Sequence, residues 1–130
     1  MFVWQLLSVL MSGFLAWAAW MQLNDPDPAR WAAFYLAGAL VALTSALRRP
    51  LPRAAGLLTL VALAWAAAIV PELLGTWRPA DLGARMSPER PEVEYGRELG
   101  GLLIVAAYCA AAAYAGRRVR APTSPDVAAR

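Results

Sequence analysis

The sequence predicts an all-α, polytopic membrane protein, a four-transmembrane-helix up-down bundle. Sixty per cent of its residues are hydrophobic, against roughly 45–50% in soluble domains. The apolar residues gather in four segments, each near the length that crosses a ~30 Å hydrocarbon core. In lipid each segment must satisfy its own backbone hydrogen bonds, and long runs without alternation favour helices over barrel strands. The segments, which contain no charged residue, are 2–23, 31–47, 54–70 and 99–116.

The expected helices extend slightly beyond these segments, and proline and glycine mark their ends. Asp27 and Pro28 suit the N-cap and first position of the second helix, and Gly75 suits the stop of the third. The loop after it is longer than most loops of compact domains, which is typical of functional or disordered segments. We expect one domain, residues 1–120, and a disordered cytoplasmic tail, 121–130. The expected helices are about 2–23, 29–48, 53–74 and 95–117, with an outer loop at 75–94.

The distribution of charge predicts the orientation in the membrane. Residues 48–53, between helices two and three, and residues 117–120, after the fourth apolar segment, carry six arginines and no acid, whereas the other two loops carry eight carboxylates. The positive-inside rule places the arginine side and both termini in the cytoplasm and the acidic loops outside. A basic set made only of arginine, beside abundant alanine, is typical of a bacterium with a high-GC genome. We therefore expect a multi-pass protein of the bacterial inner (cytoplasmic) membrane, with the lipid bilayer as its main partner.

Several function classes are disfavoured by what the sequence lacks. It contains no histidine, the usual general base and catalytic zinc ligand. It has neither a Gly-x-Ser-x-Gly motif nor a phosphate-binding loop. Its single cysteine, Cys109, lies in an apolar run and suits a small buried hydrophobe. The positive-inside rule already explains the arginine clusters, so they do not indicate nucleic-acid binding. We expect neither an enzyme nor a nucleic-acid-binding protein.

Four carboxylates at helix ends form the candidate site. Packed helix axes lie 8–10 Å apart, so these ends are expected within roughly 10 Å of each other. Carboxylates that converge must pair with arginine, share a proton or bind a cation, and oxygen ligands alone suit a hard cation such as Ca²⁺ or Mg²⁺. A salt-bridged cap is the alternative. The candidate metal ligands are Asp25, Asp27, Glu72 and Glu98, with Gln22, Asn24, Trp31 and Arg97 as further site residues.

Polar and small residues within the helices suggest packing contacts. Gln5, Ser8 and Ser12 follow spacings of three and four, which places them on one face of the first helix. Such side chains commonly join helices in membrane bundles, and a polar pathway is the alternative. Gly96 and Gly100 form a small-xxx-small step at which another helix could approach closely. This step is the candidate surface for a homo-oligomer or for a partner membrane protein.

Two outer-face segments resemble the transmembrane protein 220 family, a group of small four-span membrane proteins of unsettled activity. The first is the string from Gln22 to Pro28, followed by Trp31 and Tyr35, and the second runs from Arg97 to Ile104. The resemblance implies a four-span architecture and names no reaction. The positions that the family motifs would implicate are Asn24, Asp25, Asp27, Trp31 and Glu98.

Three functional hypotheses follow. The first is a non-enzymatic integral membrane protein whose acidic outer face binds a hard cation, a small ligand or a partner. The second is a small transporter or channel component, which would need a polar route through the bundle. The third is an accessory subunit of a larger membrane complex.

Overall fold

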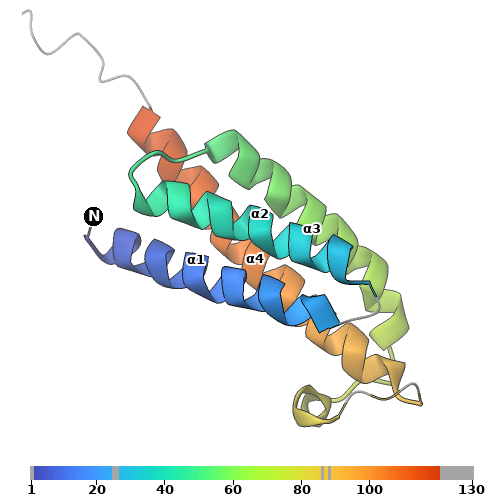
Figure 1. Cartoon of the computed structure of the whole chain (residues 1–130). Helices are drawn as coiled ribbons and strands as arrows, with labels where there is room; N and C mark the ends of the chain where they lie inside the picture. The colour runs from blue at the N-terminus through green and yellow to red at the C-terminus, as the bar shows by residue number, and fades with distance from the viewer. Residues whose placement is uncertain (1, 25–26, 86, 88, 121–130) are drawn as a thin grey trace, which may run out of the picture.

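A computed structural model describes residues 2–24, 27–85, 87 and 89–120 of the chain. This part is helical throughout its regular elements and forms four long helices that run alternately up and down (Figure 1). The predicted all-α, four-helix architecture is therefore confirmed. The predicted tail, 121–130, lies outside the described residues. The elements are α1 (Phe2–Met21), η1 (Gln22–Asn24), α2 (Pro28–Ala46), α3 (Pro52–Leu73), η2 (Pro79–Gly83) and α4 (Pro91–Arg120), where η denotes a 3-10 helix.

The helix ends follow local chemistry. Asp27 is the N-cap residue of α2 and Pro28 its first residue, but the Asp27 side chain makes no capping hydrogen bond. Gly75 follows the end of α3 with φ +85°, the left-handed conformation in which glycine ends helices without strain. Helix α4 begins at Pro91, four residues before the predicted start at 95. Acidic residues in its first turn favour this earlier start, because they interact well with the helix dipole.

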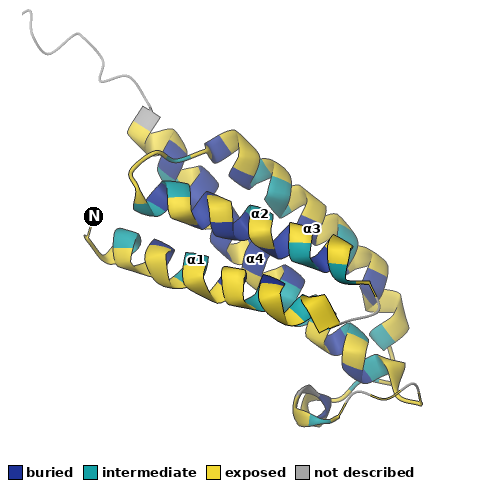
Figure 2. Ribbon diagram, viewed as in Figure 1, coloured by how far each residue is buried: buried dark blue, intermediate teal, exposed yellow. Residues whose placement is uncertain are grey.

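Each of the four helices is long and apolar enough to cross a membrane. Large apolar side chains are exposed along α1 and α3, where Figure 2 shows long outward-facing stretches. Soluble monomers rarely expose contiguous apolar surface on this scale, whereas lipid accepts it without cost. The chain is a multi-pass membrane protein. Exposed examples are Leu6, Leu10 and Trp17 on α1 and Leu57, Leu60 and Leu63 on α3.

The helices form two hairpins. Helix α1 packs chiefly on α2, and α3 packs chiefly on α4, while α2 and α4 are the most buried of the four. Leu15 of α1 is fully buried and fills the space that the missing side chain of Gly38 leaves on α2. A Cβ at Gly38 would lie 2.9 Å from Leu15 Cδ1. The ring of Tyr35 occupies the corresponding space at Gly101 of α4, which joins the two hairpins.

The polar face of α1 is used for packing, as its spacing predicted. The Tyr108 hydroxyl donates a hydrogen bond of 2.9 Å to Ser8 Oγ, and both residues are buried. Ser12 donates to the backbone carbonyl of Ala39, at 3.1 Å. Gln5 donates to the backbone of α2 near its end, at 3.4 Å. These side chains are committed to neighbouring helices, which is the role that small polar groups commonly have in membrane bundles.

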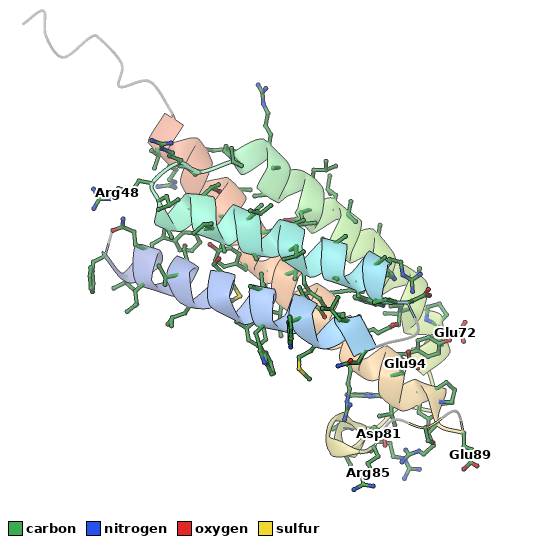
Figure 3. All side chains as sticks on the ribbon, viewed as in Figure 1. Arg48, Glu72, Asp81, Arg85, Glu89 and Glu94 are labelled. Carbon is green, nitrogen blue, oxygen red and sulfur yellow. The ribbon has the colours of Figure 1, made fainter. Side chains whose placement is uncertain are left out.

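The two ends of the bundle differ in charge. All Asp and Glu residues that the structure describes lie at the end where α3 finishes and α4 begins, which we call the acidic end. The opposite end, where α2 meets α3 and α4 finishes, carries only arginine among its described charged residues, and we call it the arginine end. Figure 3 shows Glu72, Glu89 and Glu94 at the first end and Arg48 at the second.

Candidate functional site

The predicted carboxylates lie at the acidic end but differ in their surroundings. Asp27 is 78% exposed and lies 3.7 Å from the Arg30 guanidinium. Glu72 is exposed in the last turn of α3. Glu98 is half-buried on α4, where its charge acts on the hydroxyl of Tyr35. Asp25 lies outside the described residues.

The structure does not bring the described carboxylates into one cluster. No three Asp, Glu or Cys residues gather closely enough to hold a metal ion within the described ranges. Because Asp25 lies outside those ranges, the set of four predicted from the sequence stays a prediction.

The other predicted site residues have separate surroundings. Gln22 is half-exposed and Asn24 exposed in η1, the short helix after α1. Trp31 is buried and stacks on Trp65 of α3, with their ring centroids 4.4 Å apart. The Arg30 guanidinium lies 4.9 Å from the Trp65 ring centroid, a cation–π distance. Trp31 therefore joins α2 to α3 at the acidic end.

The most organised feature of this end is the connection between α3 and α4. We call its described residues, 76–85, 87, 89 and 90, the cap. Its centre is Asp81 in η2, whose side chain is only 7% exposed. The carboxylate accepts a 2.8 Å hydrogen bond from the backbone N–H of Arg78 and a 2.6 Å hydrogen bond from Arg90 Nη2. Arg90 Nε also donates to Glu92 at 3.0 Å. The cap thus carries a nearly buried acid whose hydrogen bonds join its two ends.

These contacts determine the ionisation of the cap. The hydrogen bond from the Arg78 backbone and the charge-assisted bond from Arg90 lower the pKa of Asp81, outweighing the effect of burial, which acts in the opposite direction. Glu92 and Asp81 in turn raise the pKa of Arg90. Asp81 is therefore an ionised carboxylate at neutral pH and serves as a structural anchor.

Trp77 fixes the beginning of the cap against α4. Its indole ring lies on Gly96, where an added Cβ would lie 2.7 Å from Trp77 Cδ1. The indole N–H is buried and has no hydrogen-bond partner among the residues that the structure describes, so the contact is one of packing. The close approach predicted at Gly96 is thus made by the chain's own cap. At Gly100 an added Cβ would meet no atom of a described residue within 4 Å.

Arg97 fixes the far side of the cap. Its Nη2 donates a 2.6 Å hydrogen bond to the backbone carbonyl of Ala84, just after η2. Arg97 was predicted as a site residue from its position at the opening of helix four, and here it joins α4 to the cap. Trp77 and Arg97 thus hold the cap on α4 at two places, and Asp81 joins the two ends of the cap to each other.

Sequence reasoning did not select Asp81, although it placed the residue in the outer loop. Its local signal is the order Arg78-Pro79-Ala80-Asp81, in which proline begins a short helix and the acid three residues after Arg78 accepts that residue's backbone N–H. Its second partner, Arg90, lies nine residues away and could not be inferred from that pattern.

The Arg90→Gln variant is expected to raise the pKa of Asp81 toward its ordinary value of 3.8, but only in part, because the Arg78 backbone bond remains. Because its pKa is lowered, the Asp81 carboxylate stabilises the cap at pH values above its ordinary pKa. This stabilisation is lost as the pH falls through the pKa of Asp81 in the folded cap. An NMR titration of the Asp81 carboxyl carbon in detergent measures the change. Arg85→Gln, an exposed cap variant without a contact to Asp81, is the control. Equal pKa values in Arg90→Gln and the unaltered protein would contradict this account.

Comparison with known proteins gives one match. A family model described as "Transmembrane family 220, helix" matches residues 14–114. These residues include part of α1, all of α2 and α3, the cap and most of α4. No curated protein and no solved structure matches the chain.

Proposed function

The chain belongs to transmembrane family 220, and from this premise we propose that it is a non-enzymatic membrane protein whose cap binds a partner in the aqueous phase. The proposal includes an orientation in a bacterial inner membrane. The arginine end would face the cytoplasm, following the positive-inside rule, and the cap would face outward.

The observation that carries this proposal is the organisation of the cap. A connection between two membrane-spanning helices needs only enough length to join them, and yet this one holds a carboxylate at 7% exposure. Burying a charge costs free energy unless hydrogen bonds compensate for it, and Asp81 has such bonds from both Arg78 and Arg90. A loop with this internal order offers a fixed surface, and loops on a rigid scaffold commonly carry binding residues.

The surface of the cap suits a polar partner. Arg85 and Glu89 are exposed on it, and Glu94 is exposed beside it on the first turns of α4 (Figure 3). None of these three side chains belongs to the ion pairs that hold the cap together. Charges of both signs on one surface favour recognition of one orientation of a partner.

The interior of the bundle gives less support to transport. Leu15, Leu102 and Val105 are fully buried in the centre, and the polar side chains Gln5 and Ser8 are hydrogen-bonded within the bundle. A conducting path normally presents ionisable groups or rings of carbonyls at depth. The binding role is therefore preferred over the transporter alternative.

The small-xxx-small step supports a partner less well than the cap does. Gly96 is covered by Trp77, which leaves Gly100 as the open half of the step. A second helix that docked at Gly100 would make this chain an accessory subunit of a larger complex. We place the principal partner contact at the cap, where ordered charged groups are available.

Site-specific photo-crosslinking tests the proposal in native membranes. A crosslinking amino acid at Glu94 is expected to give one protein adduct of defined mass. The same probe at Leu60, which is 66% exposed on the apolar surface of α3, is expected to give lipid adducts only. The Glu94 adduct should be lost in the Asp81→Asn variant, because a neutral amide cannot keep the charge-assisted bond to Arg90. No adduct at Glu94, or an adduct that persists unchanged in Asp81→Asn, would overturn the role of the cap.

A bound cation is the competing explanation for the acidic end. Thermal unfolding in Ca²⁺, Mg²⁺, Mn²⁺ and chelator distinguishes the two, since a cation that binds only the folded form raises stability by about 2.7 kcal/mol at a hundred times its Kd. A cation-specific rise that disappears in Asp25→Asn and in Glu98→Gln would replace the protein partner by a metal at the predicted carboxylates. Equal stability in all four solutions is expected.

A further inference from the structure

The arginine end holds a concentration of positive charge, because the charged residues that the structure describes there are all arginine. Five of its arginine side chains are described, and none forms an ion pair with a described residue. Two of them donate hydrogen bonds to neutral groups: Arg48 to Gln5 Oε1 at 3.4 Å, and Arg118 to the Tyr114 hydroxyl. At the acidic end, by contrast, arginine pairs with carboxylates, as Arg90 does with Asp81 and Glu92. The five are Arg48, Arg49, Arg53, Arg117 and Arg118.

Close packing at Gly116 brings together the chain segments that carry these arginines. A Cβ at Gly116 of α4 would lie 3.0 Å from Pro50 Cβ and 3.3 Å from Pro52 Cβ. The turn between α2 and α3 therefore lies directly against the last turns of α4. Arg48 within this turn has φ +59°, an uncommon conformation for a residue other than glycine. The turn, the start of α3 and the end of α4 thus all carry arginine at the same end of the bundle, where the apolar spans end.

The seam between α3 and α4 offers the most defined site. The Arg117 guanidinium reaches from α4 toward α3, and its Nη2 lies 3.9 Å from where a Cβ of Gly56 would be. Arg53 lies one helical turn before Gly56, on the neighbouring face of α3. Gly56 has no side chain to fill the space beside Arg117, and both arginine side chains are exposed. Guanidinium groups match the geometry of phosphate oxygens and bind them through paired hydrogen bonds.

We propose that the arginine end binds the phosphate groups of anionic phospholipids, with Arg53 and Arg117 beside Gly56 as the principal contact. The headgroup layer begins where apolar spans end, so lipid phosphates lie at the level of these arginines. Basic sites between membrane helices are known to hold anionic headgroups, and each basic residue near such a surface contributes about a fivefold increase in affinity. This inference is independent of the cap and its partner.

Native mass spectrometry of the full chain tests it. The protein in detergent is mixed with equal amounts of phosphatidylglycerol and phosphatidylcholine that carry the same acyl chains. The bound lipid is expected to be mainly phosphatidylglycerol. The double variant Arg53→Gln/Arg117→Gln should lower this preference about 25-fold, the product of two fivefold losses. The matched control, Arg30→Gln/Arg85→Gln, removes the same charge at the acidic end and should keep the preference.

A competition experiment distinguishes a lipid phosphate from a soluble phosphate as the bound group. Glycerol phosphate and inorganic phosphate are added as soluble competitors, and neither is expected to displace the lipid at equal concentration. Displacement by either would show that the site takes a soluble phosphate and would overturn the lipid assignment. Equal binding of the two lipids, or equal loss in the two double variants, would overturn the site itself. Circular dichroism melting of both double variants confirms that each is folded when it is compared.

Discussion

Replacement of Leu15 by alanine is expected to lower the free energy of unfolding by about 2 kcal/mol. Leu15 is fully buried, and its Cδ1 fills the space over Gly38. Leucine-to-alanine changes in soluble cores cost about 2–5 kcal/mol, which includes a transfer term from water. In a bilayer the separated helices remain in lipid, so the cost comes from lost packing and lies at the lower end of that range.

The same helix provides the control for this prediction. Leu10→Ala removes an identical side chain that is 62% exposed to the lipid-facing side, and it should change the unfolding free energy by less than about 0.5 kcal/mol. Steric trapping or reversible unfolding in mixed micelles measures both variants. Equal destabilisation by the two changes would show that the packing of Leu15 against Gly38 does not hold α1 to α2.

The second large effect is expected at Gly96. An alanine there would overlap the indole ring of Trp77, so the ring must leave its place and the cap must shift with it. Overpacking of this kind costs about 1–3 kcal/mol, partly offset by about 1 kcal/mol from the better helix propensity of alanine. We expect a modest global loss of stability and a large increase in hydrogen exchange of the cap amides, residues 76–85.

Gly100→Ala is the matched variant, four residues further along α4. Within the part of the chain that the structure describes, no atom lies within 4 Å of a Cβ at that position, so the helix propensity gain of up to about 1 kcal/mol should appear alone. Hydrogen exchange mass spectrometry of both variants separates the local effect from the global one. Faster cap exchange in Gly100→Ala, or unchanged cap exchange in Gly96→Ala, would contradict the docking of Trp77 on Gly96.

Signals from residues close together in the sequence predicted much of the fold. Four apolar spans, the α2 start at Asp27 and Pro28, and the stop at Gly75 depend on residues close in sequence, and each is present. The polar spacing of Gln5, Ser8 and Ser12 predicted helix contacts, because a helix face can be read from spacing alone. Their partners on α2 and α4 could not be predicted, since these depend on how the helices are placed around one another.

The candidate site was harder to predict for the same reason. Gly96 and Gly100 look equivalent in the sequence, and only the path of the cap shows that Trp77 covers the first and not the second. Asp81 is one of several acids in its loop, and it differs from the others because Arg90, nine residues later, donates a hydrogen bond to it. The predicted carboxylates were chosen for their place at helix ends, a criterion that does not determine which side chains face one another.

The division into two hairpins has a consequence for how the protein is made. A ribosome that has released the chain as far as Ala46 has already delivered both sides of the α1–α2 interface, including Leu15 and its seat at Gly38. The first hairpin can therefore enter the bilayer and close before α4 has left the ribosome. Tyr108 and Gly101, which meet this hairpin, arrive late in translation with α4. Assembly of the protein thus ends with the docking of one finished unit on another.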